Sequence, residues 1–338
     1  MSNKLKFIGF VVSLIFLTLS LYSLDIHNIW ESFKFADYRF IPIAVILFLS
    51  SLYIRAFLWA YIIKDKIMSK NRLFLHLMMG LMANNILPAR LGEFVRAYTV
   101  GSETHISRTK IFSSIIIERI LDVFWLLCFV LTAFFLDLPS RWPMYLARFT
   151  FCLLIFLIIF FFLVHKFRDR YIKFFLWFVP NRFKLKFKNN IEFYTDMIFS
   201  GIYELKGVRI FGVFFLSFLC WVIWIVFLWI SLLTFHIHIG FVESLLLTGI
   251  INLGVMIPSA PGYIGTFQFV CVKGLSLFKI KQDVGFSFSI LFHALWYMPT
   301  TVIGMLSMWY FGQNIFRKNL DKLAIMSNEV IKNSKIKM

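Results

Sequence analysis

The sequence predicts an all-α membrane protein with several transmembrane helices. Hydrophobic residues make up 60% of the 338 positions and charged residues only 15%, a balance that soluble globular domains do not have. Apolar runs of about 20 residues, the length that spans a bilayer, recur from end to end, and two further apolar stretches are interrupted by proline and glycine. We therefore expect one integral membrane domain over residues 1–316 and a basic tail over residues 317–338.

Six apolar runs are expected to cross the membrane as full helices. The first follows two lysines and could be taken for a signal peptide. Its apolar core exceeds the roughly 7–15 residues of a signal sequence and no small-residue cleavage site follows it, so we expect an uncleaved span. The six expected spans cover residues 7–24, 40–63, 111–136, 146–165, 209–235 and 285–312.

The two interrupted stretches cover residues 73–100 and 241–278. Each is expected to form a broken, re-entrant helical hairpin that returns to the membrane face from which it came. Pro88-x-x-x-Gly92 in the first matches Pro261-x-x-x-Gly265 in the second. Matching broken segments that enter from opposite faces are typical of an inverted repeat with a site between its halves. The alternative is a protein with eight full spans.

The basic residues predict the orientation of the chain. They concentrate in the N-terminus, the 64–72 loop, the 166–209 segment and the tail from residue 317. The positive-inside rule assigns such segments to the cytoplasm, so both termini are expected there. The net charge of +18 thus indicates contact with an anionic leaflet or an anionic lipid headgroup, and no nucleic-acid partner is expected.

Charged residues stand inside the first interruption. Arg90, Glu93 and Arg96 are spaced by three, so a helix that begins after Pro88 would carry them along one face. Ionisable groups at membrane depth mark functional sites, and a helix start offers free N–H groups to an anion. Two guanidiniums suit bidentate phosphate recognition, and Gly92 allows a headgroup or a neighbouring helix to approach closely. The pattern predicts a phosphate-binding site.

A second charged cluster, Glu118-Arg119-x-x-Asp122, lies in a later apolar run. Helical spacing brings its members within one turn. Arg119 is expected to pair with Asp122 on its own helix or with Glu93 across helices, because an unpaired charge in hydrocarbon is costly. Two interpretations stay open: an ion-pair network that locks the helices together, and a polar path for a charged headgroup.

The second interruption is almost uncharged. Its freed backbone groups either bind a ligand or are satisfied by neighbouring helices, and Gln268 is the side chain expected to take part in binding. Arg55, in another span, is expected to reach the interface or join the charged network; His293 either packs or functions. The residues expected to line the site at the two helix breaks are Pro88, Gly92, Pro258, Pro261, Gly262 and Gly265.

Other chemistry is weakly signalled. His236 and His238 have no cysteine or carboxylate companions, so neither a metal site nor a cofactor is expected. The zincin, P-loop and nucleophile-elbow motifs do not occur.

The motifs resemble those of a known family, the transmembrane region of lysylphosphatidylglycerol synthases, in order, spacing and hydropathy over nearly the whole chain. That region also occurs alone, in flippase-like membrane proteins. The motifs that carry the resemblance are Leu87-Pro88-Ala89-Arg90-Leu91-Gly92-Glu93-x-x-Arg96, Glu118-Arg119-x-x-Asp122 and Pro258-x-x-Pro261-Gly262-x-x-Gly265.

The resemblance implies a lipid translocase in a prokaryotic plasma membrane. In the two-part synthases this region is associated with moving aminoacylated phosphatidylglycerol outward, and a soluble domain, expected to be absent here, makes that lipid. Relatives without it have been linked to polyprenyl-phosphate sugars and hopanoids, so the substrate does not transfer. Tyr263 stands where the family usually has glycine, and Gln268 near a usual glutamate, which weakens the expectation of a lysyl headgroup.

The leading hypothesis is therefore a flippase for a phosphate-containing lipid. Arg90 and Arg96 would bind the phosphate, while Glu93, Glu118 and Asp122 would tune charge or contact a cationic headgroup. One alternative is an intramembrane transferase or hydrolase with Glu93 or Asp122 as base. Another is an accessory subunit whose partners are lipid- or glycan-synthesis enzymes.

Overall fold

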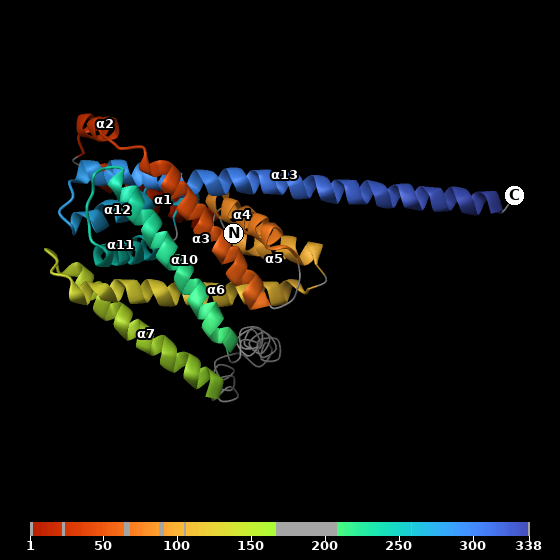
Figure 1. The fold of residues 1–338 in the computed structure, drawn as a ribbon, viewed down its shortest axis with the longest axis horizontal. Coiled ribbons are helices and arrows are strands. Elements are labelled where there is room, and N and C mark those ends of the chain that lie inside the picture. The colour runs from red at the N-terminus through yellow and green to blue at the C-terminus, as the bar shows by residue number, and fades with distance from the viewer. Residues whose placement is uncertain are drawn as a thin grey trace.

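The structure, a computed structural model, describes residues 3–21, 24–63, 68–87, 91–104, 106–166, 208–257 and 259–336. Every regular element in these ranges is helical, which confirms the predicted all-α fold (Figure 1). Three residues of the predicted site, Pro88, Arg90 and Pro258, lie outside the described residues. Most of the basic 166–209 segment lies outside them too.

Six long helices correspond to the six expected spans: α1, α3, α6, α7, α10 and α13. The helices in chain order are α1 (Asn3–Leu21), α2 (Ile26–Lys34), α3 (Phe40–Ile63), α4 (Lys70–Ile86), α5 (Gly92–Glu103), α6 (Arg108–Leu131), α7 (Trp142–Lys166), α10 (Val208–Leu233), α11 (Phe241–Gly254), α12 (Thr266–Ser276) and α13 (Gln282–Ile336), with short 3-10 helices η2 (Thr132–Phe135) and η3 (Pro261–Tyr263).

Four of these helices, α3, α7, α10 and α13, contain segments long and apolar enough to cross a membrane. Helix α6 has 24 residues, about 36 Å at 1.5 Å per residue, so it is long enough to cross, although it carries charged residues. Helices α1 and α2 are long and apolar enough to cross a membrane only when they are taken together as one span, and the angle between them is 81°. Helix α13 continues to Ile336, through residues expected to form a separate tail.

The two interrupted stretches form broken hairpins, as predicted. The first hairpin is α4–α5 and the second is α11–α12. Their helices have 17, 12, 14 and 11 residues, which corresponds to lengths between about 17 and about 26 Å. Since a bilayer core is about 30 Å thick, none of the four crosses alone. These lengths favour re-entrant hairpins over eight full spans.

The hairpins enter from opposite faces because α3 and α10 run antiparallel. Before α3, the Asp37 N–H donates to the Thr234 carbonyl after α10 (2.8 Å). At the other ends of the two helices, the Arg209 guanidinium donates to the Tyr61 carbonyl (2.6 Å). Helix α4 follows α3, and α11 follows α10. We call the two membrane faces, by the hairpin that enters from each, the α4 face and the α11 face.

The contacts between helices agree with a two-fold repeat. When the helices α3–α6 are matched in order to α10–α13, a contact in one half corresponds to a contact in the other. For example, α4 packs on α13, and its counterpart α11 packs on α6. The breaks of the two hairpins also meet, since a Cβ on Gly262 would lie 3.5 Å from the Asn85 carbonyl oxygen. Beside them, buried Phe48, Phe227 and Phe292 join α3, α10 and α13 in one aromatic core.

Candidate functional site

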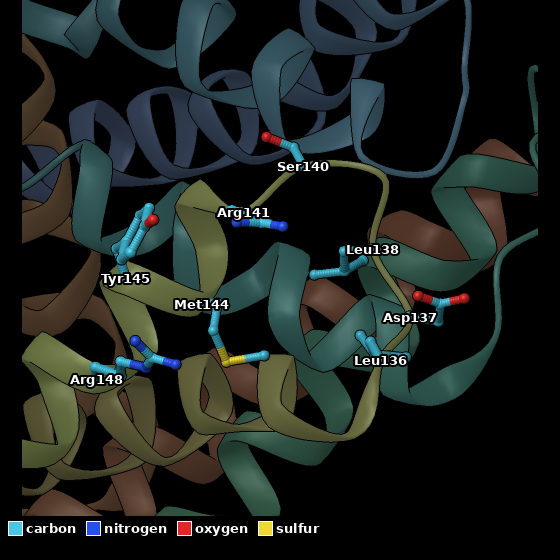
Figure 2. Close-up of a pocket in the computed structure, with 8 residues that line it drawn as sticks. All are labelled: Leu136, Asp137, Leu138, Ser140, Arg141, Met144, Tyr145 and Arg148. Atoms are coloured by element: carbon cyan, nitrogen blue, oxygen red, sulfur yellow. The ribbon is translucent and has the colours of Figure 1, made fainter.

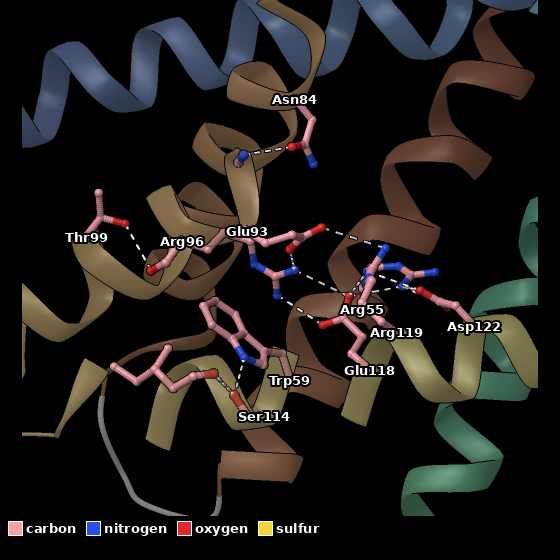
Figure 3. A network of polar contacts seen from close by, with 12 residues as sticks. Arg55, Trp59, Asn84, Glu93, Arg96, Thr99, Ser114, Glu118, Arg119 and Asp122 are labelled. Atoms are coloured by element: carbon pink, nitrogen blue, oxygen red, sulfur yellow. Dashed lines mark hydrogen bonds and ion pairs between the residues drawn. The ribbon is translucent and has the colours of Figure 1, made fainter. Parts of the chain in front are cut away.

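Charged side chains from three helices come together beside the first hairpin (Figure 3). On α6 they stand about 15–21 Å from the start of the helix, near the middle of its length. We call this group the charge cluster. Its members are Arg55 of α3, Glu93 and Arg96 of α5, and Glu118, Arg119 and Asp122 of α6.

Arg96 and Glu118 form the buried centre of the cluster. Two guanidinium nitrogens of Arg96 lie 3.0 and 3.4 Å from the two carboxylate oxygens of Glu118. Arg96 is 2% exposed and Glu118 1% exposed. The guanidinium also lies 4.1 Å from the ring centre of Trp59, whose indole N–H donates to Ser114 (2.9 Å). Such a pair is held by two contacts and a cation–π interaction.

Arg55 joins the same network from α3. One of its guanidinium nitrogens contacts Glu118 at 3.1 Å and Asp122 at 2.8 Å. Asp122 also accepts a hydrogen bond from the indole N–H of Trp221 on α10 (3.0 Å). Of the two roles expected for Arg55, a position in the network is the one found. The network thus ties α3, α5, α6 and α10 together.

Arg119 forms the accessible edge of the cluster. It pairs with Glu118 and with Asp122 (3.1 Å) and lies 3.9 Å from Glu93, so both expected partners are present. Its side chain is 41% exposed and that of Glu93 is 18% exposed. Within the described residues, the Nε–H groups of Arg96 and Arg119 are buried and have no hydrogen-bond partner. Two guanidinium donors of the cluster are therefore unsatisfied.

Close packing of the first hairpin positions Arg96. A Cβ on Gly92 would lie 1.9 Å from the Gly80 carbonyl oxygen, and a Cβ on Gly80 would lie 2.3 Å from Cγ of Arg96. The absence of side chains at both positions brings α4 against α5. The Gly92 N–H donates to the Asn84 side chain (2.7 Å), which caps the start of α5. Glycine at these two positions is what lets the arginine lie over α4.

The second break is built from backbone turns. Gly262 and Gly265 have positive φ angles of 71° and 86°, which glycine adopts without strain. The Gly265 N–H donates to the Gln268 side-chain oxygen (2.7 Å), and the Gln268 amide nitrogen lies 3.0 Å from His293 Nδ1. Ser13 of α1 accepts a hydrogen bond from the Ala260 N–H (2.8 Å). Gln268 is therefore engaged within the break itself.

The structure brings together most, though not all, of the predicted residues. Glu93, Arg96, Glu118, Arg119 and Asp122 form one network. Gln268 contacts the second break and is bound to none of them among the described residues. Pro261, Gly262 and Gly265 lie at that break. Sequence reasoning missed three supporting residues: Trp59, Ser114 and Trp221. The only signal they gave was a polar atom within an apolar run.

A cavity of about 360 Å³ lies at the turn between α6 and α7, and none of its lining residues belongs to the charge cluster (Figure 2). Because α6 starts at the α4 face, this turn lies at the α11 face. Arg141 and Arg148 line the cavity, and neither forms an ion pair within the described ranges. The full lining is Leu136, Asp137, Leu138, Ser140, Arg141, Met144, Tyr145 and Arg148. The two guanidiniums suit an anion.

Comparison with known proteins yields one family. Residues 6–304 match the family described as the lysylphosphatidylglycerol synthase TM region. A UPF0104 membrane protein of Methanothermobacter thermautotrophicus is 27% identical over 278 residues, which cover 75% of this chain and 79% of the relative. A UPF0104 membrane protein of Methanocaldococcus jannaschii is 28% identical over 284 residues, covering 78% of this chain and 81% of the relative. With its charged motifs and both broken hairpins inside the matched range, this chain belongs to the lysylphosphatidylglycerol synthase transmembrane-region family.

Proposed function

We propose that this protein moves a phosphate-containing lipid between the two leaflets of the membrane. The observation that carries the proposal is the charge cluster: three arginines and three carboxylates meet near the middle of the apolar spans, beside a broken hairpin, and one edge of the group is accessible. Charged groups at this depth are expensive and usually serve a substrate path. The acyl or prenyl chains of the lipid stay in the bilayer.

Arg119 is the first contact that we assign to the phosphate. Its side chain is the most exposed of the three arginines of the cluster, and its buried Nε–H group has no partner in the part of the chain that the structure describes. A phosphate oxygen that accepts from Arg119 replaces a carboxylate of Asp122 or Glu93, so the cluster exchanges one anion for another. Arg96 supplies a second unpartnered donor. The predicted role of Arg90 remains part of this proposal.

Arg141 and Arg148 are the contacts that we assign to the headgroup at the α11 face. Unlike the arginines of the cluster, they have no carboxylate within ion-pair distance in the described part of the chain. Guanidiniums at the membrane interface bind phosphate by paired hydrogen bonds. A lipid that has passed the cluster along α6 would reach this cavity at the end of the same helix.

The orientation that we propose assigns the α4 face to the cytoplasm. The 64–72 loop and the basic 166–209 segment adjoin helix ends at this face, and the positive-inside rule favours their retention in the cytoplasm. The membrane in question is a prokaryotic plasma membrane. Reporter fusions test the assignment: a phosphatase fused after residue 137 should be active, and one fused after residue 66 inactive. The reverse pattern would contradict it.

Lipid movement is tested with purified protein in vesicles. We expect a fluorescent phosphatidylglycerol to change leaflet and a fluorescent glucosylceramide, which has no phosphate, to stay. Arg119→Gln should slow the movement by about tenfold or more, since a hydrogen bond to a charged group contributes about 1.5–3 kcal/mol. The matched control is Arg39→Gln, because Arg39 pairs with Asp37 on the surface and is 90% exposed. Equal rates for Arg119→Gln and wild type would refute the proposal.

The same vesicles separate transport from chemistry. Mass spectrometry of the recovered lipid should find an unchanged molecule. A chemically altered lipid would instead favour the alternative of an intramembrane transferase or hydrolase that uses Glu93 or Asp122 as base.

A further inference from the structure

A second polar group, separate from the charge cluster, lies nearer the mouth of the first hairpin. His76 stands on α4, about 9 Å from the start of that helix, and is 1% exposed. Its Nε2 atom lies 3.1 Å from a carboxylate oxygen of Glu103, the last residue of α5. Its Nδ1 atom lies 3.1 Å from the hydroxyl oxygen of Thr99, also on α5. Both ring nitrogens of a buried histidine therefore have polar partners.

The hydroxyl of Thr99 can serve either protonation state of His76. Its oxygen lies 2.9 Å from the Val95 carbonyl oxygen, so the hydroxyl can donate there and accept from an Nδ1–H group. It can also turn and donate to an unprotonated Nδ1 atom. In both states the Nε2–H group donates to Glu103. One hydroxyl rotation thus satisfies the site with or without the extra proton.

We propose that His76, Thr99 and Glu103 form a proton-binding site. With the proton bound, an imidazolium faces a carboxylate and the site is neutral; without it, the site carries one negative charge. The Glu103 side chain is 19% exposed, which gives the proton a route to the water at the α4 face. The inference goes beyond lipid movement, and its test uses no lipid substrate.

The proton-binding site and the charge cluster share a helix. Thr99 is three residues from Arg96 on α5, and its hydroxyl lies 3.3 Å from the Arg96 carbonyl oxygen (Figure 3). Among the described residues, the charges that act on His76 are the carboxylate of Glu103 and the guanidiniums of Arg72, on α4, and Arg96. From α13, the ring of Phe311 stacks on the imidazole at 4.3 Å. Proton binding therefore changes the electrostatic field at Arg96.

The test measures the titration of His76 directly. Full-length protein with isotope-labelled histidine is titrated by NMR in detergent between about pH 4 and about pH 8, on either side of the ordinary imidazole pKa of about 6.5. The His76 signal is identified by its loss in His76→Gln. Glu103→Gln keeps the size of the side chain and removes its charge, so the midpoint should fall by about one pH unit or more. Glu31→Gln, on the surface of α2, should not move it.

Thr99→Val provides a second, nearly isosteric variant. It removes the hydroxyl partner of Nδ1 in both protonation states, and because an unsatisfied donor of a charged group costs more than an unsatisfied neutral acceptor, the midpoint should again fall. A His76 signal that does not titrate, or a midpoint that Glu103→Gln leaves unchanged, would overturn the proposal. Lipid movement can be absent while His76 titrates as expected, so this result and the result for the proposed function are distinguishable.

Discussion

Arg96 and Glu118 join α5 to α6 through two contacts, at 3.0 and 3.4 Å, in a region where neither side chain reaches solvent. Each residue is also bound to others of opposite charge: Arg96 to Glu93, and Glu118 to Arg55 and Arg119. The pair is therefore the centre of a balanced network. The pair contributes to stability because each residue compensates the buried charge of the other. A set of substitutions can measure this contribution to the free energy of unfolding.

Removal of one partner should destabilise the protein more than removal of both. Arg96→Met leaves the cluster with an excess negative charge and Glu118→Met with an excess positive one, and such uncompensated buried charge costs about 3–5 kcal/mol. The double variant restores balance and should cost clearly less than the sum of the two. Unfolding of each protein in detergent checks this. Additive effects would show that the two residues act independently.

The double variant also separates the two interpretations that the sequence left open. If the cluster only locks the helices together, the variant that keeps its stability should keep lipid movement. If it is a polar path, the variant should be stable and inactive. We expect the second result, because the Arg96 Nε–H group has no hydrogen-bond partner among the residues that the structure describes.

Gly92 should not tolerate alanine. The added Cβ would lie 1.9 Å from the Gly80 carbonyl oxygen and 2.6 Å from the Asn84 side-chain oxygen, and backbone has to shift to relieve the first contact. Overpacking of this kind costs about 1–3 kcal/mol, so the thermal midpoint should fall and Arg96 should be displaced. The matched control is Gly312→Ala on α13, where the Cβ meets no described residue within 4 Å and alanine favours the helix. A fall of equal size in both variants would contradict the steric explanation.

The fold followed from patterns that a single sequence records well. Long apolar runs predicted the six long helices, and proline with glycine predicted both breaks. The helix spacing of Glu118, Arg119 and Asp122 also predicted which side chains meet on α6. These are local properties of the chain, set by hydropathy and by the geometry of one helix.

Partners across helices could not be read from the sequence. The contacts of Arg55 with Glu118 and Asp122 depend on how α3 packs against α6, and nothing in the local pattern of α3 encodes that. Likewise, the sequence predicted that the Gln268 side chain binds a ligand. Its hydrogen bond to the Gly265 N–H depends on a turn with positive φ, which the sequence did not reveal. Which arginine of the cluster is accessible also depends on how the helices pack, so the exposure of Arg119 became clear only from the structure.

Asn85 should matter for the contact between the first hairpin and α13. Its amide nitrogen donates to the hydroxyls of Thr300 and Thr301, at 3.0 and 2.9 Å, from a position that is 4% exposed. Asn85→Ala removes both bonds and should lower stability by about 1–3 kcal/mol. The matched control is Asn71→Ala, since Asn71 bonds Tyr53 on the surface. Chemical unfolding in detergent compares the two; equal losses would mean that the buried link to α13 contributes no more than a surface hydrogen bond.

Gln268→Glu should make stability depend on pH. The carboxylate can still accept from the Gly265 N–H, but it cannot donate to His293 Nδ1 as the amide does, and burial disfavours its charged form. Ionisation of the carboxyl group is therefore less favourable in the folded than in the unfolded protein, so stability is greatest at low pH and falls as rising pH removes the proton. We expect the thermal midpoint of the variant, relative to wild type, to be lower at about pH 8 than at about pH 5. Gln282→Glu, at the exposed start of α13, should have no such dependence. If the midpoint of Gln268→Glu differs from that of wild type equally at both pH values, the second break accommodates a carboxylate. The glutamine at position 268 would then no longer weaken the expectation of a cationic headgroup at this break.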